Sequence, residues 1–502
     1  MISEQNIKNV PRTQTGQKRY VLIAGVGLFA VLLFHLILGT TPLVLFIAFV
    51  TILIGVFMLL ELGLENAASL VGFLFVFNTV TFAVILKTLF LQPLDSNLYR
   101  PTTGFVVVLL AVLQMFFALK IVRILPTGAP IFKPTTNLKY LKYLAVASFV
   151  IGFAFWLLNQ RFLIDRRASF YSESTSFGGF ASFTYIFYMA IVAATAYVIL
   201  STNGKRSLNI WVVLLLIVGV IIGLVASRKI ELAYTFLSYY LTSFYFRRFI
   251  SKKQVTTLAL FVVFAFFVFG PVVHTFRSEL WFLSFPQKVD FLRDNWRSVL
   301  NKAQLESFLD RVLSRRKNGY DFEYFGRNLF FIDRFATIQH IDLIIDTVEQ
   351  QEHLGAATLL RGYSRVLPRF LYSEKSTISQ ADEVTWELGL RKFGVIGFPT
   401  VPLVGHAFAA LGWAGVFFVP FYMFIILFLI LKKIGWQLYQ NIYAVFFLVP
   451  LVVNVHQWTH TQFIYRLLRE FPLLVLLLLF MAGVFKVLNG VNRRMGVADV
   501  RV

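Results

Sequence analysis

The chain has 502 residues, of which 58% are hydrophobic and only 14% are charged. Soluble domains carry about 25% charged residues, so this composition excludes an ordinary soluble protein and indicates a chain that lies mostly in lipid. The formal net charge is +22 and there is no cysteine, which excludes disulfides, thiolate metal sites and cysteine nucleophiles. The cations lie in short segments between apolar runs, as membrane insertion alone produces, so we expect no nucleic-acid partner.

Continuous apolar runs of about twenty residues recur along the chain. Such runs cross the hydrocarbon core as helices, because a helix satisfies every backbone hydrogen bond within its own segment. We predict about twelve spans, near residues 21–38, 43–60, 68–91, 103–121, 141–158, 180–200, 208–226, 230–246, 256–274, 404–431, 442–457 and 471–488. The predicted fold is therefore an all-α polytopic membrane protein.

The distribution of lysine and arginine predicts the orientation. These residues gather in loops on the cytoplasmic side, and here they occur in both terminal tails, 1–20 and 491–502. We therefore expect both termini in the cytoplasm. A large polar segment, 275–402, separates the helices of 21–274 from those of 403–490, and the same rule places it outside the membrane.

The outer segment has a pattern of its own. Apolar residues recur at helical spacing in 289–312 and 332–348, which predicts amphipathic helices that form a cap over the bundle. Pro368 prevents a helix through the residues before it. The remainder, 369–402, is polar and is predicted to be a loop.

Several cations fall on the outer face, where membrane insertion disfavours them. The candidates for ligand binding are Arg228, Arg277, Arg365, Arg369, Lys375 and Arg466. Taken singly, each of these side chains is expected to reach the lipid headgroups. Arg228 is the exception, because its turn is almost too short to leave the membrane. Arginine forks bind phosphate oxygens in pairs, so these residues suit a diphosphate. A diphosphate at a membrane indicates a polyprenyl-linked donor, whose leaving group supplies the energy for transfer.

Transfer from such a donor needs a group that accepts the proton of the acceptor hydroxyl. His406 lies at the outer start of a predicted span, and an ordinary histidine pKa near 6.5 suits that role. The competing carboxylates are Glu374, Asp382, Glu383 and Glu387. The alternative for His406 is a structural histidine that is hydrogen-bonded to a neighbouring helix.

No motif indicates a cofactor. The chain has no Walker loop, no zinc-protease signature and no nucleophile elbow, so we expect neither a nucleotide nor a resident metal. His456 and His460 have a spacing that suits zinc ligands. We instead expect this pair to end a helix beside Trp458, in the aromatic belt at the membrane interface.

Three short motifs carry a resemblance. They are a Ser227-Arg228 turn at the end of a span, the run Leu367-Pro368-Arg369 followed by Glu374-Lys375, and a glycine-rich helix start from Gly405 to Gly415. Together with the topology, they resemble the oligosaccharide repeat-unit polymerases of the Wzy type, a family that includes the O-antigen polymerases and is related to the O-antigen ligases.

The resemblance implies a metal-independent glycosyltransferase of the GT-C class in the bacterial cytoplasmic membrane. It implies transfer of a growing polyprenyl-diphosphate-linked glycan onto a new repeat unit, in contact with membrane lipids and alongside a chain-length regulator and a flippase of the same pathway. By position, Arg228 and Arg369 would bind the diphosphate and His406 would be the base, where the family more often has an acidic residue. The alternatives are an O-antigen ligase-like enzyme and a lipid-linked oligosaccharide flippase or secondary transporter.

Overall fold

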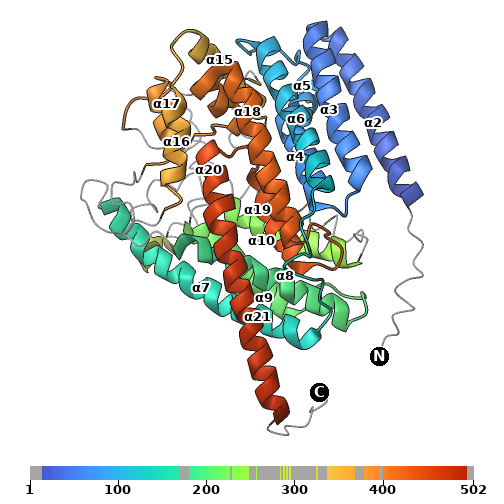
Figure 1. The fold of residues 1–502 in the computed structure, drawn as a ribbon, viewed down its shortest axis with the longest axis vertical. Helices are drawn as coiled ribbons and strands as arrows, with labels where there is room; N and C mark the ends of the chain where they lie inside the picture. Colours follow the sequence, from blue (N-terminus) through green and yellow to red (C-terminus); the bar gives the residue numbers. More distant parts are fainter. Residues whose placement is uncertain are drawn as a thin grey trace.

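The computed structural model describes a helical protein. The described residues are 14–168, 180–226, 229–247, 336–367, 378–394 and 399–494, with short pieces between 256 and 325. Helices account for the regular structure in these ranges, and no strand occurs among them. Figure 1 shows α15, α16 and α17 gathered at the upper end of the molecule around α18, whereas α21 runs to the opposite end.

The N-terminal helices are packed against one another, and α4 and α6 also pack against α18. They are α2 (Gln14–Ile37), α3 (Pro42–Leu62), α4 (Ala67–Val76), α5 (Phe82–Leu89) and α6 (Pro101–Ile124). Proline occupies the first turn of α3 and of α6, where its missing N–H removes no hydrogen bond. Asn66 caps α4 by accepting hydrogen bonds from the backbone N–H groups of Ala68 and Ser69. A π-helical turn, Phe77–Thr81, joins α4 to α5, so the two form one continuous span.

A second group of helices forms the lower part of the molecule in Figure 1. It contains α7 (Leu138–Ala168), α8 (Ile186–Ser201), α9 (Ile210–Ala226), α10 (Lys229–Arg247), α19 (Ile442–Asn454) and α21 (Phe471–Arg494). Helix α8 lies at the centre of this group because it packs against α7, α10 and α19. Its side chains are accordingly buried along almost the whole helix.

Seven helices in the described ranges are long and apolar enough to cross a membrane. They are Pro42–Leu62, Ala67–Leu89, Pro101–Ile124, Leu138–Asn159, Ser182–Ser201, Leu403–Ile434 and His460–Gly490, with shorter apolar helices at Gly25–Ile37, Ile210–Ala226 and Ile442–Asn454. The prediction of an all-α, membrane-embedded protein is thereby confirmed. The ninth predicted span, 256–274, falls almost entirely outside the described residues, so the count of twelve stays a prediction.

The segment before α18 is more helical than the sequence indicated. It contains α15 (Ile338–Glu349), α16 (Ala356–Ser364) and α17 (Gln380–Glu387). The expectation of a loop over 369–402 is wrong at α17, where the side chain of Ser379 accepts a hydrogen bond from the N–H of Asp382 and caps the helix. This Ser-x-x-Asp spacing is a helix-start signal in the sequence, but the helix is too short to show an apolar period.

Helix α15 is attached to the beginning of α6. The carboxylate of Asp342 accepts hydrogen bonds from the backbone N–H groups of Tyr99 (2.7 Å) and Arg100 (2.8 Å). Burial raises the pKa of Asp342 to about 6, while these hydrogen bonds act in the opposite direction. The side chain of Arg100 reaches back to Asp346 and Glu349 on α15. A carboxylate at a helix N-terminus is electrostatically favoured, so this contact fixes α15 over the bundle.

Helix α18 (Leu403–Ile434) is broken at Gly412, whose φ of 60° and ψ of −140° are not helical. The bend is so sharp that a Cβ atom on Gly415 would lie 2.0 Å from the carbonyl oxygen of Ala407. The backbone N–H groups of Leu354 and Gly355 donate to the carbonyls of residues 409 and 410, which the break releases. The predicted span 404–431 is therefore a short helical arm followed by a long one.

Candidate functional site

A cavity of about 520 Å³ lies where α16, α17, the start of α10 and the segment from α19 into α20 (His460–Tyr465) meet. Most of its described lining residues carry a polar side chain; they are Ile230, Arg365, Ile378, Ser379, Gln380, Ala381, Pro399, Thr400, Asn454, Gln457, Trp458, Thr459, Thr461, Gln462, Tyr465 and Arg466. The volume is typical of a small-molecule site. Two of the predicted diphosphate ligands, Arg365 and Arg466, are thus brought to one cavity from distant parts of the sequence.

Arg365 stands at the end of α16, where it forms an ion pair with Glu383 of α17. The guanidinium Nη2 lies 2.7 Å from the carboxylate, and the two side chains are 12% and 14% exposed. Burial lowers the pKa of Arg365 from its ordinary value, and Glu383 opposes that effect. Arginine stays protonated in proteins, so the cavity wall carries an arginine–carboxylate ion pair here.

Arg466 begins the π-helical turn Arg466–Glu470 that joins α20 to α21. One end of its guanidinium is paired with Glu470, whose side chain is 2% exposed, and Nη2 donates to the hydroxyl of Tyr185 at 3.0 Å. The guanidinium also lies over the ring of Tyr185, 4.7 Å from its centroid. Turns of this kind are frequent at functional sites, and this one directs a buried cation towards the cavity.

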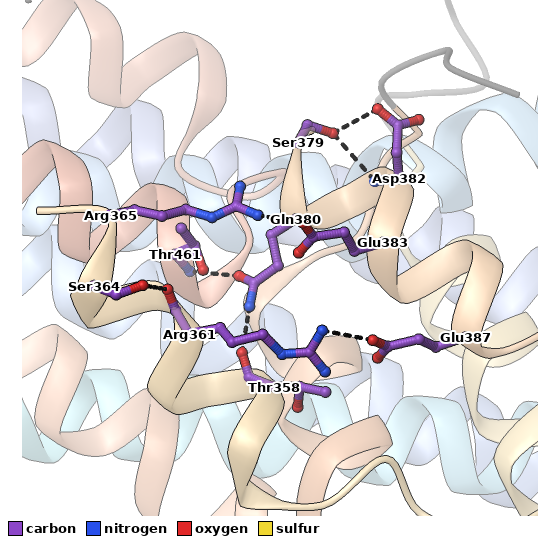
Figure 2. A network of polar contacts seen from close by, with 10 residues as sticks. All are labelled: Thr358, Arg361, Ser364, Arg365, Ser379, Gln380, Asp382, Glu383, Glu387 and Thr461. Atoms are coloured by element: carbon purple, nitrogen blue, oxygen red, sulfur yellow. Dashed lines mark hydrogen bonds and ion pairs between the residues drawn. The ribbon is translucent and has the colours of Figure 1, made fainter. Parts of the chain in front are cut away.

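Gln380 connects the three helices around the cavity. Its side-chain amide donates to the carbonyl of Thr358 on α16, and its oxygen accepts from the N–H of Thr461 on α20 at 3.2 Å. Figure 2 shows Gln380 between the two arginine–carboxylate pairs of α16 and α17. Because both ends of its amide are engaged, Gln380 fixes the relative positions of these helices.

Glu387, a predicted candidate for the base, lies outside the described lining of the cavity. It forms an ion pair with Arg361 at 2.6 Å, with side chains 32% and 46% exposed. Figure 2 shows this pair beside the Arg365–Glu383 pair, one helical turn away on both helices. The structure therefore places Glu387 as a link between α16 and α17.

His406, the first candidate for the base, is completely buried on the short arm of α18. Its ring centroid lies 6.1 Å from that of His460, and neither ring nitrogen has a hydrogen-bond partner among the described residues. It does not belong to the described lining of the cavity. The structural alternative, a histidine satisfied by a neighbouring helix, is not what these residues show.

Five predicted site residues lie outside the described residues, and their roles stay predictions. They are Arg228, Arg277, Arg369, Glu374 and Lys375. Ile230, which lines the cavity, follows the first of them by two positions in the chain.

His456 and His460 lie close to the cavity but serve different contacts. Nε2 of His456 is 2.9 Å from the amide nitrogen of Gln457, and burial lowers the pKa of His456 to about 3. His460 shares a hydrogen bond with the hydroxyl of Tyr422. In the ranges that the structure describes, no three His, Cys, Asp or Glu side chains are grouped as metal ligands.

The amide and hydroxyl groups that line the cavity are not among the site residues predicted from the sequence. Thr459 and Gln462 form a capping box at the start of α20, and this Thr-x-x-Gln spacing can be recognised in a sequence. Asn454 is different, because only the tertiary packing brings the end of α19 beside α10 and α20.

Comparison with known proteins gives no relative from which a function can be taken. No protein family, no curated protein and no solved structure matches the chain. The resemblance to the repeat-unit polymerases therefore stays a prediction from sequence, and the function has to be argued from the cavity.

Proposed function

We propose that the protein is a membrane-embedded glycosyltransferase that polymerises polyprenyl-diphosphate-linked oligosaccharide repeat units. The observation that carries the proposal is the pair of buried guanidinium groups, Arg365 and Arg466, in one cavity with many polar side chains beside membrane-spanning helices. A ligand for such a site needs an anionic group and polar oxygens, together with a lipid part that reaches the apolar bundle. A lipid diphosphate that carries a sugar has all three.

Both arginines are held in place by a carboxylate. Glu383 and Glu470 each form an ion pair with one guanidinium, and a guanidinium presents its N–H donors in a fixed fork that matches phosphate oxygens. No carboxylate belongs to the described lining. We place Arg228 and Arg369 at the same diphosphate because of the sequence resemblance.

The remaining lining suits a glycan. Amide side chains such as Gln457 and Gln462 both donate and accept hydrogen bonds, which matches sugar hydroxyls, and Trp458 and Tyr465 add aromatic rings. In the reaction, the acceptor oxygen bonds to the anomeric carbon while the bond to the lipid diphosphate breaks. The candidate bases are His406, Glu374 and Glu387.

The test is transfer by the purified protein in detergent or liposomes, with a polyprenyl-diphosphate oligosaccharide as both donor and acceptor. The wild type should form longer glycans and release polyprenyl diphosphate. Arg466→Lys should lose most activity because a point charge does not replace a guanidinium fork. Arg123→Ala is the matched control, since it removes an arginine–glutamate pair remote from the cavity, and it should retain activity.

Two other outcomes identify the alternatives. Movement of the lipid across the vesicle without transfer would show a flippase. Transfer of the whole glycan to a different acceptor, without growth of the repeat-unit chain, would show a ligase-like enzyme.

We place the cavity at the outer face of the bacterial cytoplasmic membrane. Because the chain contains no cysteine, Gln351→Cys, an exposed position between α15 and α16, provides a single labelling site. We expect an impermeant thiol reagent to label it in intact cells. Labelling only after the inner membrane has been opened would contradict this orientation.

A further inference from the structure

A line of hydrogen-bonding side chains runs from the surface into the protein between α16, α18 and α20. Tyr363 of α16 is 40% exposed, and its hydroxyl donates to the hydroxyl of Tyr422 on α18 at 3.2 Å. Tyr422 shares a hydrogen bond with Nε2 of His460 at the start of α20. His460 is itself completely buried, so three side chains connect the protein surface to the interior.

The buried end of this line adjoins His406. The rings of His406 and His460 are 6.1 Å apart, and His406 has no hydrogen-bond partner among the described residues. A buried polar group without a partner typically costs about 1–3 kcal/mol of stability, and such groups are rare in native proteins. A role in proton transfer accounts for a buried imidazole at this position, because the ring can accept a proton and pass it on.

The same line also adjoins the cavity. Thr461 lines the cavity and follows His460 directly in α20. A Cβ atom on Gly362 of α16 would lie 2.8 Å from Oγ1 of Thr461 and 3.4 Å from Nδ1 of His460. Both side chains therefore face the same glycine, and His460 lies immediately behind the cavity wall.

The bend at Gly412 brings His406 and Tyr422 to the same residue, His460. His406 and Tyr422 are sixteen positions apart in the sequence, which corresponds to about 24 Å along a straight helix. In the structure, the rings of both residues have centroids 6.1 Å from the ring of His460. A straight α18 would separate the buried imidazole from the tyrosine that leads to the surface.

We infer that His460, Tyr422 and Tyr363 form a proton path from the cavity wall to the outer solvent, with His406 at its inner end. The inference rests on the proposed transferase function, because each transfer releases one proton from the acceptor hydroxyl. The acceptor O–H bond breaks as its oxygen bonds to the anomeric carbon, and the electron pair of the broken glycosidic bond leaves with the lipid diphosphate. The proton is taken up by an imidazole nitrogen of the histidine pair. The two tyrosine hydroxyls then turn, so that Tyr422 donates to Tyr363 instead of accepting from it. The Tyr422 oxygen takes the proton from the imidazole, the proton of Tyr422 passes to Tyr363, and the proton of Tyr363 enters solvent.

The decisive variant is Tyr422→Phe, which removes one hydroxyl in the middle of the path and keeps the ring. We expect turnover to fall roughly 10- to 100-fold, while the Kd for the lipid-linked donor stays within about twofold. Tyr363→Phe should have a smaller effect on turnover, because solvent reaches that position and water can replace its hydroxyl. His460→Gln should match Tyr422→Phe, because an amide does not relay protons as an imidazole does.

The matched control is Tyr443→Phe. This change removes a buried tyrosine–tyrosine hydrogen bond, 2.5 Å to Tyr140, between α19 and α7, and turnover should stay at the wild-type level. Wild-type turnover in Tyr422→Phe would overturn the inference and leave the transferase proposal intact. A parallel loss of donor binding and thermal stability in Tyr422→Phe would also overturn it, because the hydroxyl would then be structural. An inactive wild type would contradict the proposed function and this inference together.

Discussion

Buried polar side chains on the two sides of α20 differ in whether they have a partner. On the cavity side, Arg365 and Arg466 are each paired with a glutamate. On the side that faces α18, His406 is completely buried and has no partner among the described residues. A paired charge is held in one position, as ligand binding requires, whereas an unpartnered imidazole destabilises the fold. From this difference we assign anion binding to the cavity side and proton transfer to His406.

The largest expected effect is a loss of stability when the bend in α18, which positions His406, is disrupted. In Gly415→Ala the new Cβ would lie 2.0 Å from the carbonyl oxygen of Ala407, so the two arms of α18 cannot keep their positions. We expect destabilisation of more than about 3 kcal/mol, beyond the usual range for overpacking, and loss of folded protein in size-exclusion chromatography. Gly483→Ala on α21 is the control, because nothing lies within 4 Å of its Cβ position. A folded, fully stable Gly415→Ala protein would contradict the described bend.

The next effect concerns the cavity side. Arg466→Leu leaves the carboxylate of Glu470, 2% exposed, without its cation. Breaking a buried ion pair from one side costs about 3–5 kcal/mol, whereas replacing both partners by apolar residues is close to neutral. The double variant Arg466→Leu/Glu470→Leu should therefore recover thermal stability but not donor binding. If the double variant binds donor as the wild type does, Arg466 is only structural.

A smaller effect is expected from Asp342, which attaches α15 to α6. Its pKa in the folded protein, about 6, lies above the ordinary 3.8, so the folded state binds the proton more tightly than the unfolded chain. Its contribution to stability should consequently decrease as the pH rises from about 4 to about 6. Thermal denaturation of the wild type and Asp342→Asn across this range tests the sign. A wild type that gains stability relative to Asp342→Asn with rising pH would contradict it.

The smallest effect is expected at the Arg361–Glu387 pair, which is the exposed counterpart of the Arg365–Glu383 pair. Arg361 and Glu387 are 46% and 32% exposed, and such pairs contribute less than about 1 kcal/mol. Arg361→Ala should therefore change thermal stability little, whereas Arg365→Ala, one turn along α16, should lower it more and weaken donor binding. Equal losses in both variants would show that burial does not distinguish the two pairs.

Much of the membrane fold followed from the sequence alone. Apolar runs such as 43–60 and 103–121 predicted α3 and α6 to within a few residues, because the length of a membrane helix is set by the thickness of the bilayer. Proline in the first turn marks the start of α3 and of α6, and an asparagine cap marks the start of α4. The choice of Arg365 and Arg466 as candidates also came from the sequence, because membrane insertion disfavours cations on the outer face unless they have a role.

Only the tertiary structure decided what those residues form together. Sequence distance gives no indication that Arg365 and Arg466 line one cavity, because α16 and α20 meet only when both pack on α18. The glycine-rich stretch up to Gly415 was predicted to begin a helix, and nothing local shows that it bends α18 and brings His406 and Tyr422 to the same histidine. Helix formation depends on neighbours along the chain and on the lipid around it, whereas this site depends on contacts between helices that are distant in sequence.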